Sequence, residues 1–165
     1  MPDDTGPAKA WALMEKVGFC MLATLDDGQI RSRPMAAYVR PEENAVWFLT
    51  DADSAKEQDV VAHPQVNLAF ADAGGQTYVS VSGQAAIADD REKIRELFST
   101  PAKAWWQSAD DPSIRVLRVT PTEAEYWDSP GTLRATIRMA AAAVSDARPV
   151  MGDHEKVAME AAASD

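Results

Sequence analysis

The sequence contains few of the residues from which disulfides and metal centres are built. It has one cysteine, Cys20, and two histidines, His63 and His154, in 165 residues. A single cysteine cannot form an intramolecular disulfide and rules out a cysteine-rich metal site. The histidines are far apart in the sequence, and no HExxH-like spacing occurs. We therefore expect no metal centre and no Ser-His-Asp hydrolase site.

Long apolar runs and positive charges are also scarce. No run approaches the roughly 20 apolar residues of a transmembrane helix, and the acidic start, MPDDTG, is unlike a signal peptide. Sixteen Lys and Arg stand against 26 Asp and Glu, so the net charge is −10. An acidic protein repels phosphate backbones. These features predict a cytoplasmic protein that binds neither nucleic acid nor a membrane.

The rest of the composition is that of one globular domain. Apolar residues make up 46% and charged residues 25% of the chain, close to the averages of folded proteins. The length is typical of a single domain. We expect a flexible N-terminus over residues 1–7 and a folded domain over residues 8–138. Residues 139–165, rich in alanine and acidic residues, are expected to form a flexible or partly helical tail.

Short apolar or alternating segments separated by turn residues predict a mainly β protein. The expected strands are residues 19–25, 30–39, 45–50, 66–72, 77–88, 113–119 and 124–127, with a turn at Pro121 and Thr122. Tight turns such as DDG join several of them, which favours an antiparallel sheet. No GxGxxG or GxxxxGK[ST] motif points to a common nucleotide-binding fold. The pattern predicts a six- to seven-stranded, mostly antiparallel β-barrel with peripheral helices.

The first two strands carry more detailed expectations. Residues 19–25 are apolar without a break, so both faces of this strand are expected to be buried. Pro34 lies inside the second strand and cannot donate a ladder hydrogen bond. That strand is therefore expected to be bulged near Pro34 or to lie at a sheet edge.

Helices are expected between the strands. One covers about residues 8–17. Ser54, followed by Glu57 three residues later, has the capping-box pattern and predicts a helix that ends before Pro64. Another helix is expected to follow residues 89–90.

The few cations of the strand region suggest an anion site. Between residues 17 and 90 they are Arg31, Arg33, Arg40 and Lys56. Arg31 and Arg33 are two residues apart on one expected strand, so their side chains share a face, where a phosphate would relieve their repulsion. Lys56 lies at the start of the expected helix, whose free N–H groups favour an anion.

The alternative is that these groups are structural. The two arginines would then pair with surface carboxylates, and Ser54 would only cap the helix. Cys20 is expected to be an inert buried thiol, and His63 a helix cap. Among the five tryptophans, Trp11 and Trp47 are expected in the core, although such rings also form the walls of sites for planar ligands.

Five sequence blocks, in this order, resemble the pyridoxamine 5′-phosphate oxidase-like flavoproteins, and in particular the general stress protein 26 branch. The blocks are FCMLATLDDGQIRSRPM, VWFLTDADSAK, HPQVNLAFAD, YVSVSGQAAI and EYWD, within residues 8–138. The resemblance implies a mainly β, antiparallel split barrel of the FMN-binding type. It also implies a homodimer with flavin at the subunit interface.

The resemblance further implies a set of cofactor-binding residues. Arg31, Ser32, Arg33, Pro34 and Met35 match the first FMN-contacting strand. Trp47, Phe48, Leu49 and Thr50 match the strand along the flavin ring, whose backbone would bond the ring edge. Ser54 and Lys56 match the phosphate-binding turn. Trp127 matches a tryptophan beside the flavin, and Gln84 is a further match.

The function implied is that of an FMN-binding oxidoreductase acting on an unidentified small molecule. Pyridoxamine-phosphate oxidases carry arginine and histidine after the matching tryptophan, whereas residues 128–134 here have no histidine and one arginine, which argues against that activity. One alternative is a non-catalytic flavin-binding or flavin-sequestering stress protein. Another is the same fold with FAD, the deazaflavin F420 or, with least support, haem.

Overall fold

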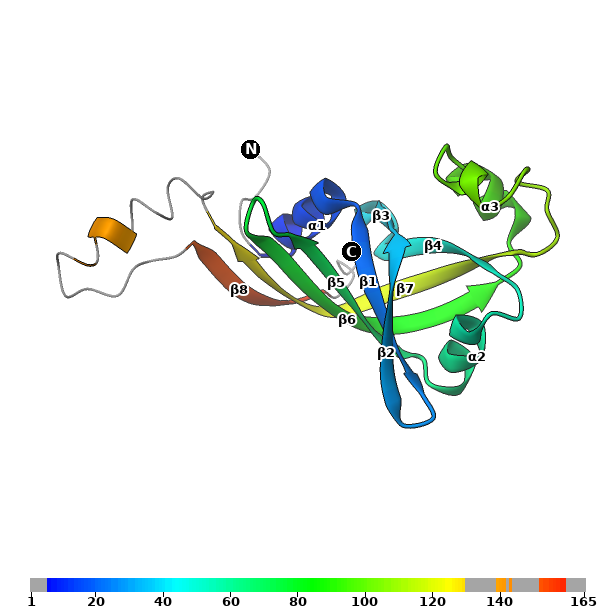
Figure 1. The fold of residues 1–165 in the computed structure, drawn as a ribbon, viewed down its shortest axis with the longest axis horizontal. Coiled ribbons are helices and arrows are strands. Elements are labelled where there is room, and N and C mark those ends of the chain that lie inside the picture. Colours follow the sequence, from blue (N-terminus) through cyan, green and yellow to red (C-terminus); the bar gives the residue numbers. More distant parts are fainter. Residues whose placement is uncertain (1–5, 130–138, 142, 144–151, 160–165) are drawn as a thin grey trace, which may run out of the picture.

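The computed structural model describes residues 6–129, 139–141, 143 and 152–159, and it shows one twisted antiparallel sheet (Figure 1). The strands are β1 (Phe19–Asp26), β2 (Gln29–Ala36), β3 (Tyr38–Arg40), β4 (Ala45–Asp51), β5 (Gln65–Asp72), β6 (Thr77–Ala88), β7 (Ile114–Asp128) and β8 (Asp153–Ala158). The helices are α1 (Gly6–Val17), α2 (Ala55–Ala62) and α3 (Arg91–Leu97), with 3₁₀ turns η1 (Pro41–Glu43) and η2 (Ala102–Ala104). The mainly β, antiparallel prediction is confirmed, with eight strands in the described residues.

Strand β7 connects the two ends of the sheet. The order is β2-β1-β5-β6-β7-β4-β3, and β8 also pairs with β7. One edge of β7 pairs with β6, while the other edge pairs first with β4, as far as Val119, and then with β8, from Glu123 onward. Figure 1 shows β8 beside the end of β7 that is far from α3.

Two apolar clusters hold these elements together. The larger cluster lies between the strands and α1, and its fully buried side chains include Leu22, Phe48, Phe70 and Tyr126. The smaller cluster packs α3 against β4 and β7 around Ile94. Each large apolar side chain removed from water contributes about 1.5–3 kcal/mol, so the larger cluster is the main source of stability.

Strand β2 confirms one of the two expectations for Pro34. Its register with β1 runs without a shift from Phe19 opposite Ala36 to Asp26 opposite Gln29, so there is no bulge. Instead, β2 is an edge strand, where a missing N–H donor leaves no ladder bond unmade. The expectation that both faces of residues 19–25 are buried is wrong for the described chain, because Phe19 is 61% exposed.

The expected turn at Pro121 and Thr122 is also wrong, because β7 passes through both residues. The register with β6 shifts there: Ser82 lies opposite Glu123, but Gly83 lies opposite Pro121. Thr122 is the extra residue of this bulge, and its hydroxyl donates a hydrogen bond to the Ser82 carbonyl at 3.1 Å. A β-bulge accommodates the proline without ending the strand.

The ends of the chain differ from the prediction. Helix α1 begins at Gly6, inside the stretch 1–7 that was expected to be flexible, and residues 1–5 lie outside the described residues. The prediction of a flexible or partly helical tail over residues 139–165 is wrong for β8. The folded domain therefore extends beyond residue 138.

Strand β8 was not predicted from the sequence because its stabilising contacts are with residues distant in the sequence. The Lys9 ammonium on α1 lies 2.8 Å from an Asp153 oxygen and 3.1 Å from an Asp128 oxygen. Burial alone would lower the pKa of Lys9, but hydrogen bonds to Asp153 and Asp128 raise it well above its usual value. Tyr126 donates a hydrogen bond to Glu155 at 2.6 Å. These partners are distant in sequence, so local composition carries no sign of them.

The helices agree with their sequence signals. Ser54 is the N-cap of α2 and accepts a hydrogen bond from the Glu57 N–H at 3.3 Å. The helix ends with His63 as its C-cap, directly before Pro64. Asp90 caps α3 in the same way. Among the described residues, no helix has the length and apolar character needed to cross a membrane.

We predict that Gly83→Ala destabilises the protein by about 1–3 kcal/mol, the usual cost of overpacking. A Cβ at this position would lie 2.6 Å from the Thr120 carbonyl oxygen and 2.9 Å from a Val119 methyl group. Urea unfolding followed by circular dichroism measures the change. Gly74→Ala is the matched control, because its Cβ would meet its nearest neighbour, an Asp72 oxygen, at an ordinary 3.6 Å. Equal stability of the two variants would contradict the close approach of β6 and β7.

Candidate functional site

A hollow of about 640 Å³, here called the main hollow, lies beside β2, β4 and the start of α2. Its volume is within the roughly 300–1,000 Å³ range of small-molecule sites. Arg33, Thr50 and Lys56 supply polar groups. Met35 and Trp105 represent the apolar part of the lining, and most of the lining is apolar. The main hollow thus combines cations with apolar walls.

Arg33 is held from behind by buried polar groups. One guanidinium nitrogen donates to the Thr24 hydroxyl at 2.6 Å, and the other lies 3.5 Å from an Asp59 carboxylate oxygen. The Thr24 hydroxyl in turn donates to that carboxylate at 2.8 Å. Thr24 and Asp59 are both buried, so a fixed network orients Arg33 at the hollow.

Lys56 faces the same hollow from the first turn of α2. Burial lowers the pKa of Lys56, the nearby Arg33 lowers it further, and Asp51 only partly opposes this. Within the part of the chain that the structure describes, no carboxylate lies within ion-pair distance of Lys56. Two cations that repel each other beside an open hollow define a place where an anion is favoured.

Ser54 has the structural role that its sequence pattern predicts. Its hydroxyl caps α2 and lies 3.4 Å from the Thr50 hydroxyl, which belongs to the hollow. Ser54 is therefore next to the main hollow without lining it. Thr50 is 2% exposed, and its hydroxyl and the cap form a partly buried polar link between β4 and α2.

Arg31 does not join Arg33 in the main hollow. The register places Arg31 opposite Thr24 and Arg33 opposite Leu22, so the two arginines share a face as expected. Arg31, however, is 61% exposed, and its Nε lies 3.0 Å from an Asp26 oxygen. Arg31 therefore pairs with a surface carboxylate, as the alternative interpretation of the two arginines predicted, whereas Arg33 lies where an anion could reach it. Ser32 points to the opposite face of β2.

Of the four β4 residues predicted to bind the cofactor, two line the main hollow and two are buried in the protein interior. Leu49 and Thr50 line the main hollow, together with Pro34 and Met35 of β2. Phe48 is fully buried in the larger cluster. Trp47 is buried under α3, where its ring N–H donates to Glu43 at 2.8 Å.

The backbone of β4 still offers groups to a ligand. Strand β3 pairs only with the segment of β4 from Ala45 to Trp47. From Phe48 onward, therefore, that edge of β4 has no partner strand among the described residues. An open strand edge carries unpaired N–H and C=O groups. This is the feature that the predicted backbone hydrogen bonds would need.

Trp127 and Gln84 lie away from the main hollow within one chain. Trp127 borders a second hollow of about 390 Å³, where its ring stacks on His154 with centroids 5.0 Å apart and planes 9° apart. His154 also lies 2.7 Å from a Glu125 oxygen. Gln84 is an exposed residue on β6, opposite Gln65. The structure therefore brings together only part of the predicted set.

Sequence reasoning missed several residues of the site. Thr24 and Asp59, which hold Arg33, were not predicted, although Asp59 follows Lys56 by three residues and so shares its helix face. Trp105 and Trp106, which wall the main hollow, were not among the predicted site residues either. Burial raises the pKa of the Cys20 thiol to about 12, in agreement with the predicted inert thiol.

The fold and the main hollow are those of a small β-sheet protein with a candidate site for a small anionic ligand, and known proteins share this fold. A model of the pyridoxamine 5′-phosphate oxidase-like proteins matches residues 6–149. The chain belongs to this family. A structure assigned to general stress protein 26 from Jannaschia sp. CCS1 is 28% identical, with a TM-score of 0.74, covering 91% of this chain and 95% of that one. The resemblance to this branch and the split-barrel fold are thereby confirmed.

Two further relatives broaden the comparison. The general stress FMN/FAD binding protein of Xanthomonas citri is 25% identical, with a TM-score of 0.65, over 75% of this chain and 89% of that one. Protein bli-3 of Neurospora crassa is 29% identical over 120 residues, which is 66% of this chain. That match spans only 57% of the length of bli-3.

Proposed function

We propose that this protein binds FMN in the main hollow and acts as a flavin-dependent oxidoreductase on a small molecule. The observation that carries the proposal is that Arg33 and Lys56 both line the main hollow, where burial lowers the pKa of Lys56 and the nearby Arg33 lowers it further. The phosphate of FMN carries close to two negative charges at neutral pH and would relieve this repulsion. The Xanthomonas citri relative, described as FMN/FAD binding, adds support.

The remaining walls fit the rest of the cofactor. A flavin ring is flat and largely apolar, and the hollow offers Leu49, Met35 and Trp106. The open edge of β4 can bond the polar rim of such a ring. When bound, the flavin supplies hydride or electron transfer. The residues of the chain bind and orient it and limit the access of water.

The proposed function is flavin-dependent oxidoreduction of a small molecule, and it does not include the oxidation of pyridoxamine phosphate in particular. The segment in which that activity would require arginine and histidine, residues 128–134, is described only at Asp128 and Ser129. A non-catalytic flavin-binding protein would share every contact named above. Turnover separates the two: reduction by NAD(P)H followed by reoxidation with an acceptor supports an enzyme. Stoichiometric binding without turnover supports a binder.

Lys56→Met should weaken FMN binding at least about tenfold, because a charge-assisted hydrogen bond contributes roughly 1.5–3 kcal/mol. Riboflavin, which lacks the phosphate, should bind the variant and the wild type equally. The same change should leave the melting temperature of the ligand-free protein unchanged or raised, because it removes a charge that Arg33 repels. Flavin fluorescence quenching and calorimetry provide the measurements.

The charge-matched control is Lys156→Met on β8, where the lysine is exposed and paired with Glu123. It should not alter FMN affinity. If Lys56→Met and wild type retain FMN equally, the phosphate does not bind at Lys56 and the site assignment is wrong. A wild-type protein that remains colourless after addition of FMN and desalting would remove the oxidoreductase proposal itself.

The preference for FMN over riboflavin should fall as pH rises. Lys56 has a pKa below the ordinary value of 10.5, so in the ligand-free protein it loses its proton as the pH rises through that lowered pKa. FMN binding favours protonated Lys56, and affinity is therefore greatest at pH values below the pKa of Lys56. Lys56→Arg stays charged throughout and should not show this fall. Parallel profiles for Lys56→Arg and wild type would contradict the role of Lys56.

We also propose that a second copy of the chain covers a group of exposed apolar side chains on the outer face of the sheet. Met21 on β1, Tyr78 on β6 and Trp127 on β7 share the outer face, and they are 39%, 41% and 38% exposed. Phe19, on the same face of β1, also lines the main hollow. A second copy seated there would lie beside the hollow, as expected of a cofactor site between subunits.

Light scattering should therefore give a mass of two chains of 17.9 kDa. Met21→Glu should shift it to one chain, because a carboxylate would be buried in the interface. Val61→Glu is the control, since Val61 is 77% exposed on α2. A single-chain mass for the wild type at micromolar concentration would rule out this dimer.

A further inference from the structure

The segment between α3 and β7 forms an aromatic wall of the main hollow. Pro101, Ala102, Ala104, Trp105 and Trp106 all line it from this segment. Trp105 is 82% exposed, although tryptophan is large and aromatic and is on average a highly buried side chain. A ring this large, left in solvent at the edge of a hollow, is available to a ligand.

Two contacts fix the inner side of this segment to the hollow. The Trp106 ring N–H donates to an Asp51 carboxylate oxygen at 2.8 Å, so β4 positions the wall. The Tyr38 and Ser99 hydroxyls lie 3.1 Å apart, which joins the start of the segment to β3. The single hydrogen-bond donor of Trp106 is thus satisfied within the fold, whereas most of the Trp105 ring is exposed to solvent.

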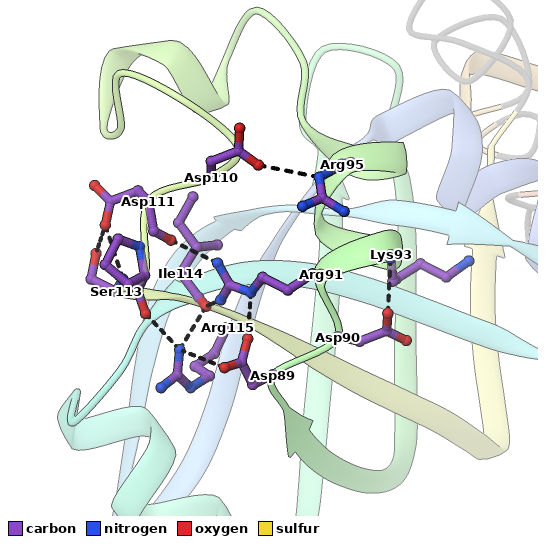
Figure 2. A network of polar contacts seen from close by, with 11 residues as sticks. Asp89, Asp90, Arg91, Lys93, Arg95, Asp110, Asp111, Ser113, Ile114 and Arg115 are labelled. Carbon is purple, nitrogen blue, oxygen red and sulfur yellow. Dashed lines mark hydrogen bonds and ion pairs between the residues drawn. The ribbon is translucent and has the colours of Figure 1, made fainter.

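Polar contacts fix the outer side as well (Figure 2). Arg91 donates to the Asp111 carbonyl at 2.8 Å and also to the Ile114 carbonyl. Arg95 lies 3.2 Å from an Asp110 oxygen. The Asp111 carboxylate accepts hydrogen bonds from the N–H and hydroxyl of Ser113, which lower the pKa of that carboxyl. The segment returns to β7 through this network, so Trp105 is presented from a braced loop.

We propose that Trp105 is a specificity-determining residue that stacks on a flat, neutral aromatic substrate in the main hollow. The inference rests on the proposed function, because it assigns Arg33 and Lys56 to the cofactor phosphate. Aromatic pairs with centroids about 4.5–7 Å apart attract each other beyond the burial of their area. The neighbouring lining residues of this wall, Pro101 and Ala104, offer no side-chain donor.

Charge narrows the class of substrate further. The cations of the hollow lie at Arg33 and Lys56, where the phosphate is placed. The carboxylate near the wall, Asp51, would repel an anionic substrate and is already bonded by Trp106. A neutral ring system, such as that of a quinone, therefore fits this wall better than an anionic or saturated molecule.

Isothermal calorimetry with menadione, a neutral bicyclic quinone, tests the proposal on the FMN-loaded protein, with saturated cyclohexanone as the comparison. We expect menadione to bind more tightly than cyclohexanone. Trp105→Ala should weaken menadione binding about tenfold, in line with aromatic stacking energies. Trp105→Phe should restore most of the affinity, and the affinity for FMN should change less than about twofold. Val61→Ala, a similarly exposed apolar residue on α2, should change nothing.

Three results would overturn the proposal. Unchanged menadione affinity in Trp105→Ala would show that the ring does not contact the substrate. Equal affinity of the wild type for menadione and cyclohexanone would exclude an aromatic preference. A change of oligomeric mass in Trp105→Ala would mean that a second chain covers the ring. Failure of the wild type to bind FMN defeats the proposed function instead, and menadione titration of the FMN-free protein then decides the role of Trp105.

Discussion

The placement of two cations, Arg33 and Lys56, beside one hollow is the constraint around which the site is built. An acidic chain with a net charge of −10 has many carboxylates that could neutralise both groups. Among the described residues, Asp59 fixes Arg33 from behind, while Lys56 keeps a lowered pKa beside the hollow. The arrangement favours the binding of an anion, because the charge of Lys56 is destabilising only while no anion occupies the hollow.

The elements around this pair are those that hold it in place. The unbroken β1–β2 register sets Arg33 on the face of Thr24, and the Ser54 cap starts α2 where Lys56 and Asp59 share one side of the helix. The bulge at Thr122, opposite Ser82 and Gly83, allows β7 to run through Pro121 and to keep both β4 and β8 on one edge. Local backbone choices therefore fix the position of the charges.

Much of this could be read from the sequence because the signals are local. The Ser54–Glu57 pair sets the start of α2, and the alternation in β6 predicts its buried face. Arg31 and Arg33 could not be told apart, since both leave the same face of β2. Their difference lies in the partner each meets, Asp26 across the hairpin or Asp59 on α2. Strand β8 was not predicted for a similar reason, because its partners Lys9 and Tyr126 are distant from it in the sequence.

The two sides of the main hollow would bind ligands by different interactions. The Arg33–Lys56 side acts through charge, and the Trp105 side acts through apolar contact. The Arg33–Lys56 side acts at short range, since salt screens charges beyond about 8–10 Å, so the acidic surface elsewhere weakens it little. The Trp105 side depends on shape and burial, which salt hardly affects. Affinity for an anionic cofactor and choice of an apolar substrate can then vary independently, because loop changes at Trp105 leave the β2–α2 charges where they are.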